Sequence, residues 1–184
     1  SAQATKLPAT LTVTAYETGS NGFNQAVAVG AMLKKSFGTD MRVLPAGNDV
    51  ARLGPLKAGR AQASAMGIGT YFAQEGVLEF AVKEWGPQPL QLILSSSTCS
   101  GQSLGAANDA GIKSAADMKG KRAGIVVGSP AVNQSVLALI AFGGWTANDV
   151  KLVEFASYGA MMKGVVNNEI DLFFASTISG LAKE

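Results

Sequence analysis

The chain has 184 residues but no histidine, and Cys99 is its single cysteine. Without histidine it cannot carry Ser-His-Asp or Cys-His catalysis, and it lacks the usual set of zinc ligands. One cysteine cannot form an internal disulfide, so we expect Cys99 to be a small, semi-buried apolar residue. These absences weigh against the common hydrolase classes and against a metal site.

Charge is also scarce. Asp, Glu, Lys and Arg make up 15% of the chain, against about a quarter in an average globular protein. The formal net charge is +2, and the one basic cluster, 113–122, contains Asp117. A nucleic-acid partner is not expected, because such proteins present a basic face with stacking aromatic side chains. No run reaches the ~18 apolar residues that a membrane span needs.

The first ten residues, SAQATKLPAT, are small and polar, with no basic-then-apolar signal segment. We expect 1–10 to be the stub left after removal of a signal peptide. That would place the mature protein in the periplasm or another extracytoplasmic compartment. A cloning scar is the alternative.

The remaining composition is that of a globular protein, with 47% hydrophobic residues and 22 glycines. Apolar periodicity predicts alternating strands and helices, which is typical of a parallel α/β sheet. Asp49 is expected to cap the second helix. The expected strands are 11–15, 41–44, 61–66, 90–94, 123–127, 150–155 and 170–175. The expected helices are 25–37, 49–58, 130–142 and 158–167, with a short helix and turn at 112–121.

The two halves of the chain repeat each other. Gly19-Ser20 reappears as Gly128-Ser129, an offset of 109 residues (129 − 20), and the same offset relates Asn24 to Asn133. Without a gap, it also superposes the order strand, Gly-Ser loop, helix, strand, loop, helix, strand. We therefore predict two similar α/β lobes, 11–98 and 99–184.

Two such lobes predict a ligand cleft between them. Ligands of open α/β sheets bind beyond the carboxyl ends of the strands, and the loops at those ends are rich in Gly, Ser, Thr and Asn here. The predicted ligand-binding residues are Thr18, Gly19, Ser20, Asn21, Phe23, Asn48, Gly67, Ser129, Val132, Ser157, Tyr158 and Ser176.

The two Gly-Ser loops precede helices, whose first turns leave about four N–H groups unpaired and favour an anion. Ser20 and Ser129 would then hold a carboxylate, or would simply cap their helices. Asn48 offers a donor and an acceptor, with a capping role as the alternative. Tyr158 would close over the ligand or pack at a lobe surface. Arg42 and Arg52 are expected at the solvated surface, with pairing to an anionic ligand as the alternative.

The loops offer no evident reaction. The first lobe contains neither the P-loop pattern nor a complete G-x-G-x-x-G after its strand, which argues against nucleotide binding. No paired carboxylates have an acid–base spacing. The prediction is a binding protein with no catalytic residue, no metal and no cofactor.

The chain resembles the TAXI-type solute receptors of TRAP transporters. The segments that carry the resemblance are TGSNGFNQAVAVGAMLKK (18–35), VLPAGNDVARLGPLKAGRAQASAMG (43–67), GIKSAADMKGKRAGIVVGSPAVNQSVLALIAFGGWTANDVKL (111–152) and MMKGVVNNEIDLFFAS (161–176). Phe23 stands where many members have a second glycine, and Gln62 where an acidic residue is common. The resemblance covers about 11–177.

This resemblance implies the type II periplasmic-binding-protein fold, with a second lobe that is incomplete in this chain. It implies an extracytoplasmic receptor that closes on a small organic anion, a dicarboxylate or an amino acid, and delivers it to the permease subunits of a TRAP transporter. An incomplete lobe would expose apolar surface, so a homodimer is a further expectation. The alternatives are the sensing domain of a transcription regulator and an enzyme on the same fold that uses Cys99 as a cofactor anchor.

Overall fold

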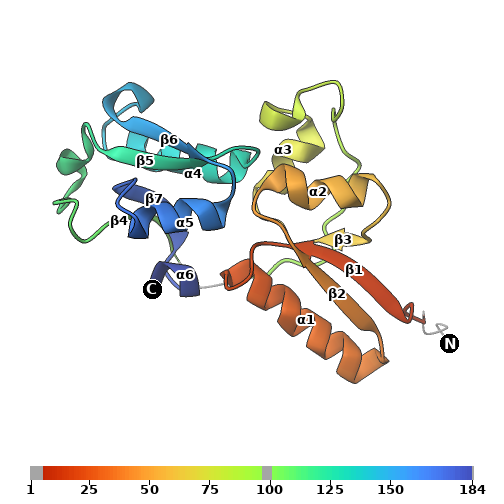
Figure 1. The fold of residues 1–184 in the computed structure, drawn as a ribbon. Helices are drawn as coiled ribbons and strands as arrows, with labels where there is room; N and C mark the ends of the chain where they lie inside the picture. Colours follow the sequence, from red (N-terminus) through yellow and green to blue (C-terminus); the bar gives the residue numbers. More distant parts are fainter. Residues whose placement is uncertain (1–5, 97–100, 184) are drawn as a thin grey trace.

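The structure is a computed structural model, and it describes residues 6–96 and 101–183. Cys99 and the predicted lobe boundary at 98/99 lie outside these residues, so the domain limits stay a prediction. Within the described residues the chain forms two sheets, each with its own helices (Figure 1). We call 10–80 lobe 1 and 102–183 lobe 2.

Lobe 1 is a small parallel sheet with the strand order β2-β1-β3. Its α1 begins after Ser20, whose side chain accepts a bond from the N–H of Phe23, and ends at Gly38 in the left-handed conformation. The elements are β1 (Thr10–Ala15), α1 (Asn21–Phe37), β2 (Asp40–Pro45), α2 (Asp49–Lys57), β3 (Ala63–Ser64), α3 (Gly69–Glu75) and the 3₁₀ turn η1 (Leu78–Phe80).

Lobe 2 has four strands in the order β4-β7-β5-β6, with β4 antiparallel to β7 and the other pairs parallel. Its elements are β4 (Gln102–Ala106), η2 (Ala115–Met118), β5 (Arg122–Val126), α4 (Pro130–Phe142), η3 (Ala147–Asp149), β6 (Lys151–Phe155), α5 (Tyr158–Val166), β7 (Leu172–Ser176) and α6 (Gly180–Lys183). The short α6 returns to lobe 1, where Leu181 Cδ2 lies 3.6 Å from the position that a Cβ on Gly19 would take (Figure 1).

The internal repeat is a repeat of structure. α2 covers 49–57 and α5 covers 158–166, so both ends are related by 109 residues (158 − 49 and 166 − 57). The residues before them, Asn48 and Ser157, both cap through a side-chain oxygen. The order β2-β1-β3 in lobe 1 also corresponds to β6-β5-β7 in lobe 2. The same edge of each sheet therefore carries the equivalent loops.

The cores of the lobes are unequal. Lobe 2 buries two apolar clusters, centred on residues such as Ile140 and Met161, which are both 0% exposed. The cluster of lobe 1 is built on Leu53, Ala73 and Phe80 alone. In α1 only Ala26 is buried. Lobe 2 thus gives the firmer framework for the loops between the lobes.

One expected strand is absent, and two elements were not predicted. Leu90–Leu94 is not a strand: Leu92 and Ile93 are 79% and 83% exposed, and a strand without a hydrogen-bonding neighbour is not stable in water. The short helix and turn expected at 112–121 is present as the 3₁₀ helix η2, which has a capping box and is followed by a turn. The pattern also missed β4 and α3, because small polar residues and Gly67–Thr70 give no clear period.

Candidate functional site

The two lobes touch through the loops that follow their strands. The N–H of Val50 donates to the carbonyl oxygen of Gly128 at 3.1 Å. The N–H of Tyr158 donates to the carbonyl oxygen of Gly47 at 3.0 Å. These bonds place the start of α2 against the Gly-Ser loop of lobe 2, and the loop after β2 against the start of α5.

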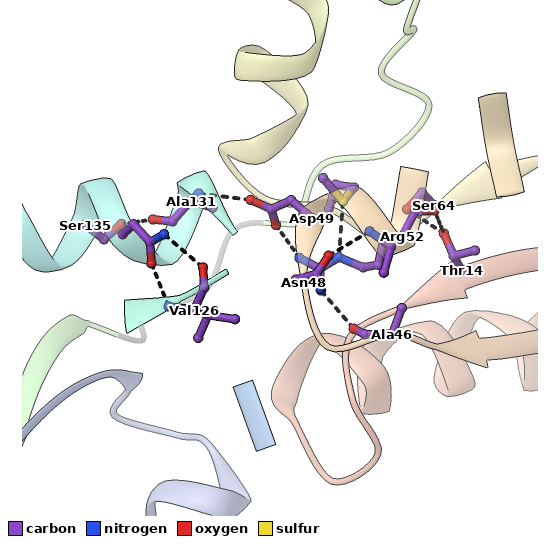
Figure 2. Close-up of polar contacts among 12 residues, drawn as sticks. Thr14, Ala46, Asn48, Asp49, Arg52, Ser64, Val126, Ala131 and Ser135 are labelled. Carbon is purple, nitrogen blue, oxygen red and sulfur yellow. Dashed lines mark hydrogen bonds and ion pairs between the residues drawn. The ribbon is translucent and has the colours of Figure 1, made fainter. Parts of the chain in front are cut away.

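The side chain of Asp49, a residue of lobe 1, forms a hydrogen bond with the backbone of lobe 2. Its side chain is 1% exposed, and its Oδ2 accepts a 2.9 Å bond from the N–H of Ala131 in the first turn of α4 (Figure 2). The same carboxylate pairs with the guanidinium of Arg52, one turn further along α2. Asp49 is therefore not the helix cap that the sequence suggested. That cap is Asn48, whose Oδ1 accepts from the N–H of Ala51 at 2.7 Å.

The carboxylate of Asp49 occupies the positive end of α4. Ser129 precedes this helix and is 2% exposed, but its side chain makes no capping bond to the helix. Burial raises the pKa of the Asp49 carboxyl, while the charge of Arg52 and the N–H of Ala131 act in the opposite direction. In this arrangement a side chain of lobe 1 fills the place where the sequence predicted a bound anion.

Arg52 is fully engaged and only 3% exposed, so the expectation that it is solvated is wrong. Its guanidinium carbon lies 3.9 Å from the centroid of the Tyr16 ring, and its Nη1 donates to the carbonyl oxygen of Ala46 at 3.0 Å (Figure 2). Arg42 is exposed, as expected. A buried guanidinium needs its carboxylate partner, so Arg52 fixes Asp49 in position.

A second acidic side chain, that of Glu17, lies at the start of α5. A Cβ placed on Gly159 would be 2.4 Å from Glu17 Oε2, and one on Gly47 would be 2.7 Å from Oε1. Two glycines from opposite lobes thus leave room for this carboxylate. Oε2 is buried and has no hydrogen-bond partner.

Tyr158 begins α5 next to this carboxylate. Its hydroxyl donates to the carbonyl oxygen of Phe174 at 3.0 Å, so the side chain is anchored in lobe 2. Burial, with a smaller contribution from the negative charge of Glu17, raises the pKa of Tyr158 to about 12. The phenol is therefore neutral at physiological pH.

A cavity of about 680 Å³ opens beside Glu17 and has walls from both lobes. Lobe 1 contributes the loops after β1 and β2, and lobe 2 contributes α5, Phe173 and α6. Thr18 and Ser157 bring hydroxyls to it, whereas Met162 and Val166 form part of an apolar wall. Its volume is that of a pocket for a small organic molecule.

The structure brings only part of the predicted site together. Thr18 and Ser157 line the cavity, and Gly19 and Ser20 lie beside it in the loop that α6 contacts. Ser129 and Asn48 belong to the lobe contact around Asp49. The others do not line the cavity: Asn21 and Phe23 in α1, Gly67 against the hydroxyl of Tyr16, Val132 between the two cores of lobe 2, Tyr158 on Phe174, and Ser176 at the end of β7.

Sequence reasoning missed Glu17, Asp49 and Lys163 as residues of the contact and the cavity. Glu17 directly precedes the loop that begins with Thr18, and a charged residue at that place, in a chain with few charges, could have indicated a role at the site. Lys163 lies one turn into α5, and its place on the cavity wall depends on how the lobes meet. Neither the repeat nor the periodicity contains that information.

Within residues 6–96 and 101–183, no three His, Cys, Asp or Glu side chains gather in a way that would hold a metal ion. Within the same residues, no helix is both long and apolar enough to cross a membrane.

The geometry defines a two-lobed binding-protein fold, and solved structures share it. The alkanesulfonate-binding protein SsuA from Xanthomonas axonopodis pv. citri, bound to MOPS, is 19% identical with a TM-score of 0.60, over 90% of this chain and 53% of that one. An ancestral arginine-binding protein bound to arginine is 21% identical with a TM-score of 0.61, over 96% and 74%. AbpA from Streptococcus pneumoniae, an amino acid ABC transporter substrate-binding protein bound to L-arginine, is 13% identical with a TM-score of 0.59, over 94% and 69%.

The fold is thus α/β and type II periplasmic-binding-protein-like, as predicted. The chain belongs to the NMT1/THI5-like family, whose model matches residues 69–180. No curated protein sequence matches it. The chain spans about half the length of the SsuA structure and about three quarters of the ancestral arginine-binding protein.

Proposed function

We propose that this protein is an extracytoplasmic solute-binding receptor that holds a small organic acid between its lobes. The observation that carries the proposal is the cavity of about 680 Å³, lined by the loops after β1 and β2 of lobe 1 and mainly by α5 of lobe 2. Lys163 on its wall supplies positive charge for an acid group, and the hydroxyls of Thr18 and Ser157 supply hydrogen bonds.

The similar structures support the choice of ligand class. They were solved with arginine and with MOPS, which both combine an acid group with a basic nitrogen. Of the two ligand classes that the sequence predicted, an amino acid shares this combination of an acid group with a basic nitrogen, whereas a dicarboxylate shares only the acid group.

The proposed receptor acts outside the cytoplasm after removal of a signal peptide and delivers its solute to a membrane permease. The resemblance to TAXI-type receptors favours the permease subunits of a TRAP transporter. An ABC-type permease is the second candidate, because AbpA, which shares the fold, is named as the binding protein of an ABC transporter. Copurification of this chain with each class of permease would separate the two.

A thermal-shift screen of dicarboxylates, amino acids and sulfonates, followed by calorimetry, tests the receptor proposal. A ligand at about 100 times its Kd should stabilise the folded protein by about 2.7 kcal/mol, which corresponds to several degrees in Tm. If no compound of the three classes raises Tm, the chain does not bind such solutes and the receptor proposal is wrong.

A further inference from the structure

Glu17 carries a carboxylate with one buried oxygen that no other group of the described residues bonds. Its Oε2 is buried and lacks any hydrogen-bond partner, although the desolvation of a carboxylate is costly unless the charge is paired. Among residues 6–96 and 101–183 it takes part in no ion pair. The other interlobe carboxylate, that of Asp49, is in contrast satisfied by Arg52 and by the N–H of Ala131.

The backbone is shaped around this carboxylate. Gly47 and Gly159, which lie on opposite lobes, approach it so closely that a Cβ on either would fall within 2.7 Å of a carboxylate oxygen. The side chain therefore has a fixed place on the cavity wall when the lobes are together. The carbonyl oxygen of Gly47 accepts a hydrogen bond from the N–H of Tyr158, the residue before Gly159, and this bond keeps the two glycines close together.

The cavity gives a partner access to Glu17. Of the residues that the structure describes, Glu17 is the only acidic one on its wall, and Lys163 is the only basic one. A metal ion is a poor candidate, because hard cations take six or more oxygen ligands and a single carboxylate faces the cavity. A protonated amine or a guanidinium needs only one carboxylate and a few hydrogen-bond acceptors.

We propose that Glu17 is the recognition residue for a cationic nitrogen on the solute, so that the ligand is an amino acid, an aminosulfonate or a related amine-bearing acid rather than a simple anion. The charge-assisted hydrogen bond from the solute to the Glu17 carboxylate, which lines the cavity, supplies the counter-charge that this half-buried group lacks. The acid group of the solute lies toward Lys163. This inference rests on the proposed solute-binding function and narrows it to one substrate class.

The test uses ligand pairs that differ in the ammonium group alone. 4-Aminobutyrate is compared with pentanoate, and taurine with propanesulfonate, by calorimetry on the full chain. L-Arginine serves as a larger probe with two cationic groups. The variant is Glu17→Gln, which keeps the size of the side chain and removes its charge. The matched control is Glu154→Gln, an exposed residue of β6 outside the cavity lining.

We expect at least one amine-bearing probe to bind, and its amine-free counterpart to bind at least about tenfold more weakly, as loss of a charge-assisted bond implies. Glu17→Gln should weaken the amine-bearing probe by a similar factor, and Glu154→Gln should leave it unchanged. Gly159→Ala, which would put a methyl group against Oε2, should repeat the loss.

The outcomes separate this inference from the receptor proposal. If the amine-free acids bind as well as their partners, or if Glu17→Gln leaves amine affinity unchanged, the inference is overturned while the receptor proposal stands. If no acid of either kind binds, both are overturned. The ligand-free Tm of Glu17→Gln supplies a second readout: removal of a buried, unpaired charge should leave Tm equal or raise it, whereas a purely structural role would lower it.

Discussion

The carboxylate of Asp49, in the first turn of α2, accepts a hydrogen bond of 2.9 Å from the backbone N–H of Ala131 in the first turn of α4. This single bond joins two helices that start 81 residues apart in the sequence (130 − 49). It also places a negative charge at the positive end of a helix dipole, which is a favourable arrangement. The contact between the lobes is thus built on an internal carboxylate.

Asp49→Asn should strongly destabilise the protein. The substitution leaves the guanidinium of Arg52 buried without a counter-charge and weakens the bond to Ala131. Breaking a buried pair on one side costs about 3–5 kcal/mol. Urea unfolding at neutral pH measures this loss.

The matched control is Asp40→Asn. Asp40 also forms an ion pair, with Lys34, but its side chain is 65% exposed. An exposed pair contributes about 1 kcal/mol or less. Equal losses for the two variants would show that the Asp49 contact is no stronger than a surface pair.

Asp171→Asn should lower stability by about 1–3 kcal/mol near neutral pH. Asp171 is 14% exposed, and its two oxygens take bonds from the side chain and backbone of Arg122, which tie the start of β5 to the residue before β7. Hydrogen bonds from Arg122 are the main cause that lowers the pKa of the Asp171 carboxyl, and burial opposes them.

The sign of the pH dependence follows from that depression. A carboxyl whose pKa is lower in the folded state stabilises the protein above its unfolded pKa, near 4, and loses this contribution as pH falls through the folded pKa. The difference between wild type and Asp171→Asn should be constant from about pH 5 to 8 and should shrink below about pH 4. Urea unfolding at each pH measures this stability difference. If the difference between wild type and Asp171→Asn grew in acid, this account would be wrong.

The sequence predicted the fold better than the site for a definite physical reason. α4 at 130–142 and the offset of 109 were predictable, because helix period and capping residues are local features. Leu92 and Ile93 have the composition of a strand, yet pairing depends on a neighbour that local sequence does not reveal. The role of Asp49 is also non-local: its partner Ala131 comes from the other lobe.

Tyr158→Phe should cost about 1 kcal/mol at pH 8, because it removes the bond to the carbonyl oxygen of Phe174. The pKa of Tyr158 is raised to about 12 in the folded protein. The stabilisation that the neutral phenol provides is therefore fully present below the ordinary tyrosine pKa, and it is lost as pH rises from there toward about 12. The gap between wild type and variant should therefore narrow above about pH 10.

The control is Tyr71→Phe. At this 56% exposed position the substitution should change stability by less than about 0.5 kcal/mol. A gap that is unaffected by alkali would mean that Tyr158 does not titrate as a buried phenol.

The final prediction uses the internal repeat as its own control. Asn133 and Asn24 are equivalent by sequence, but their environments differ. Asn133 accepts a 2.8 Å bond from the N–H of Val126 and donates a 2.9 Å bond to the carbonyl oxygen of the same residue, which fixes the end of β5 before the Gly-Ser loop. Asn24 is exposed on α1.

Asn133→Ala leaves two backbone groups of Val126 without these partners, so it should cost about 1–3 kcal/mol. Asn24→Ala should lie within about 0.5 kcal/mol of wild type, since alanine favours a helix and the side chain faces solvent. Guanidinium unfolding of both variants makes the comparison. If the two asparagines proved equally costly to replace, the repeat would be one of energetics as well as of structure, and the picture of lobe 2 as the firmer framework would be wrong.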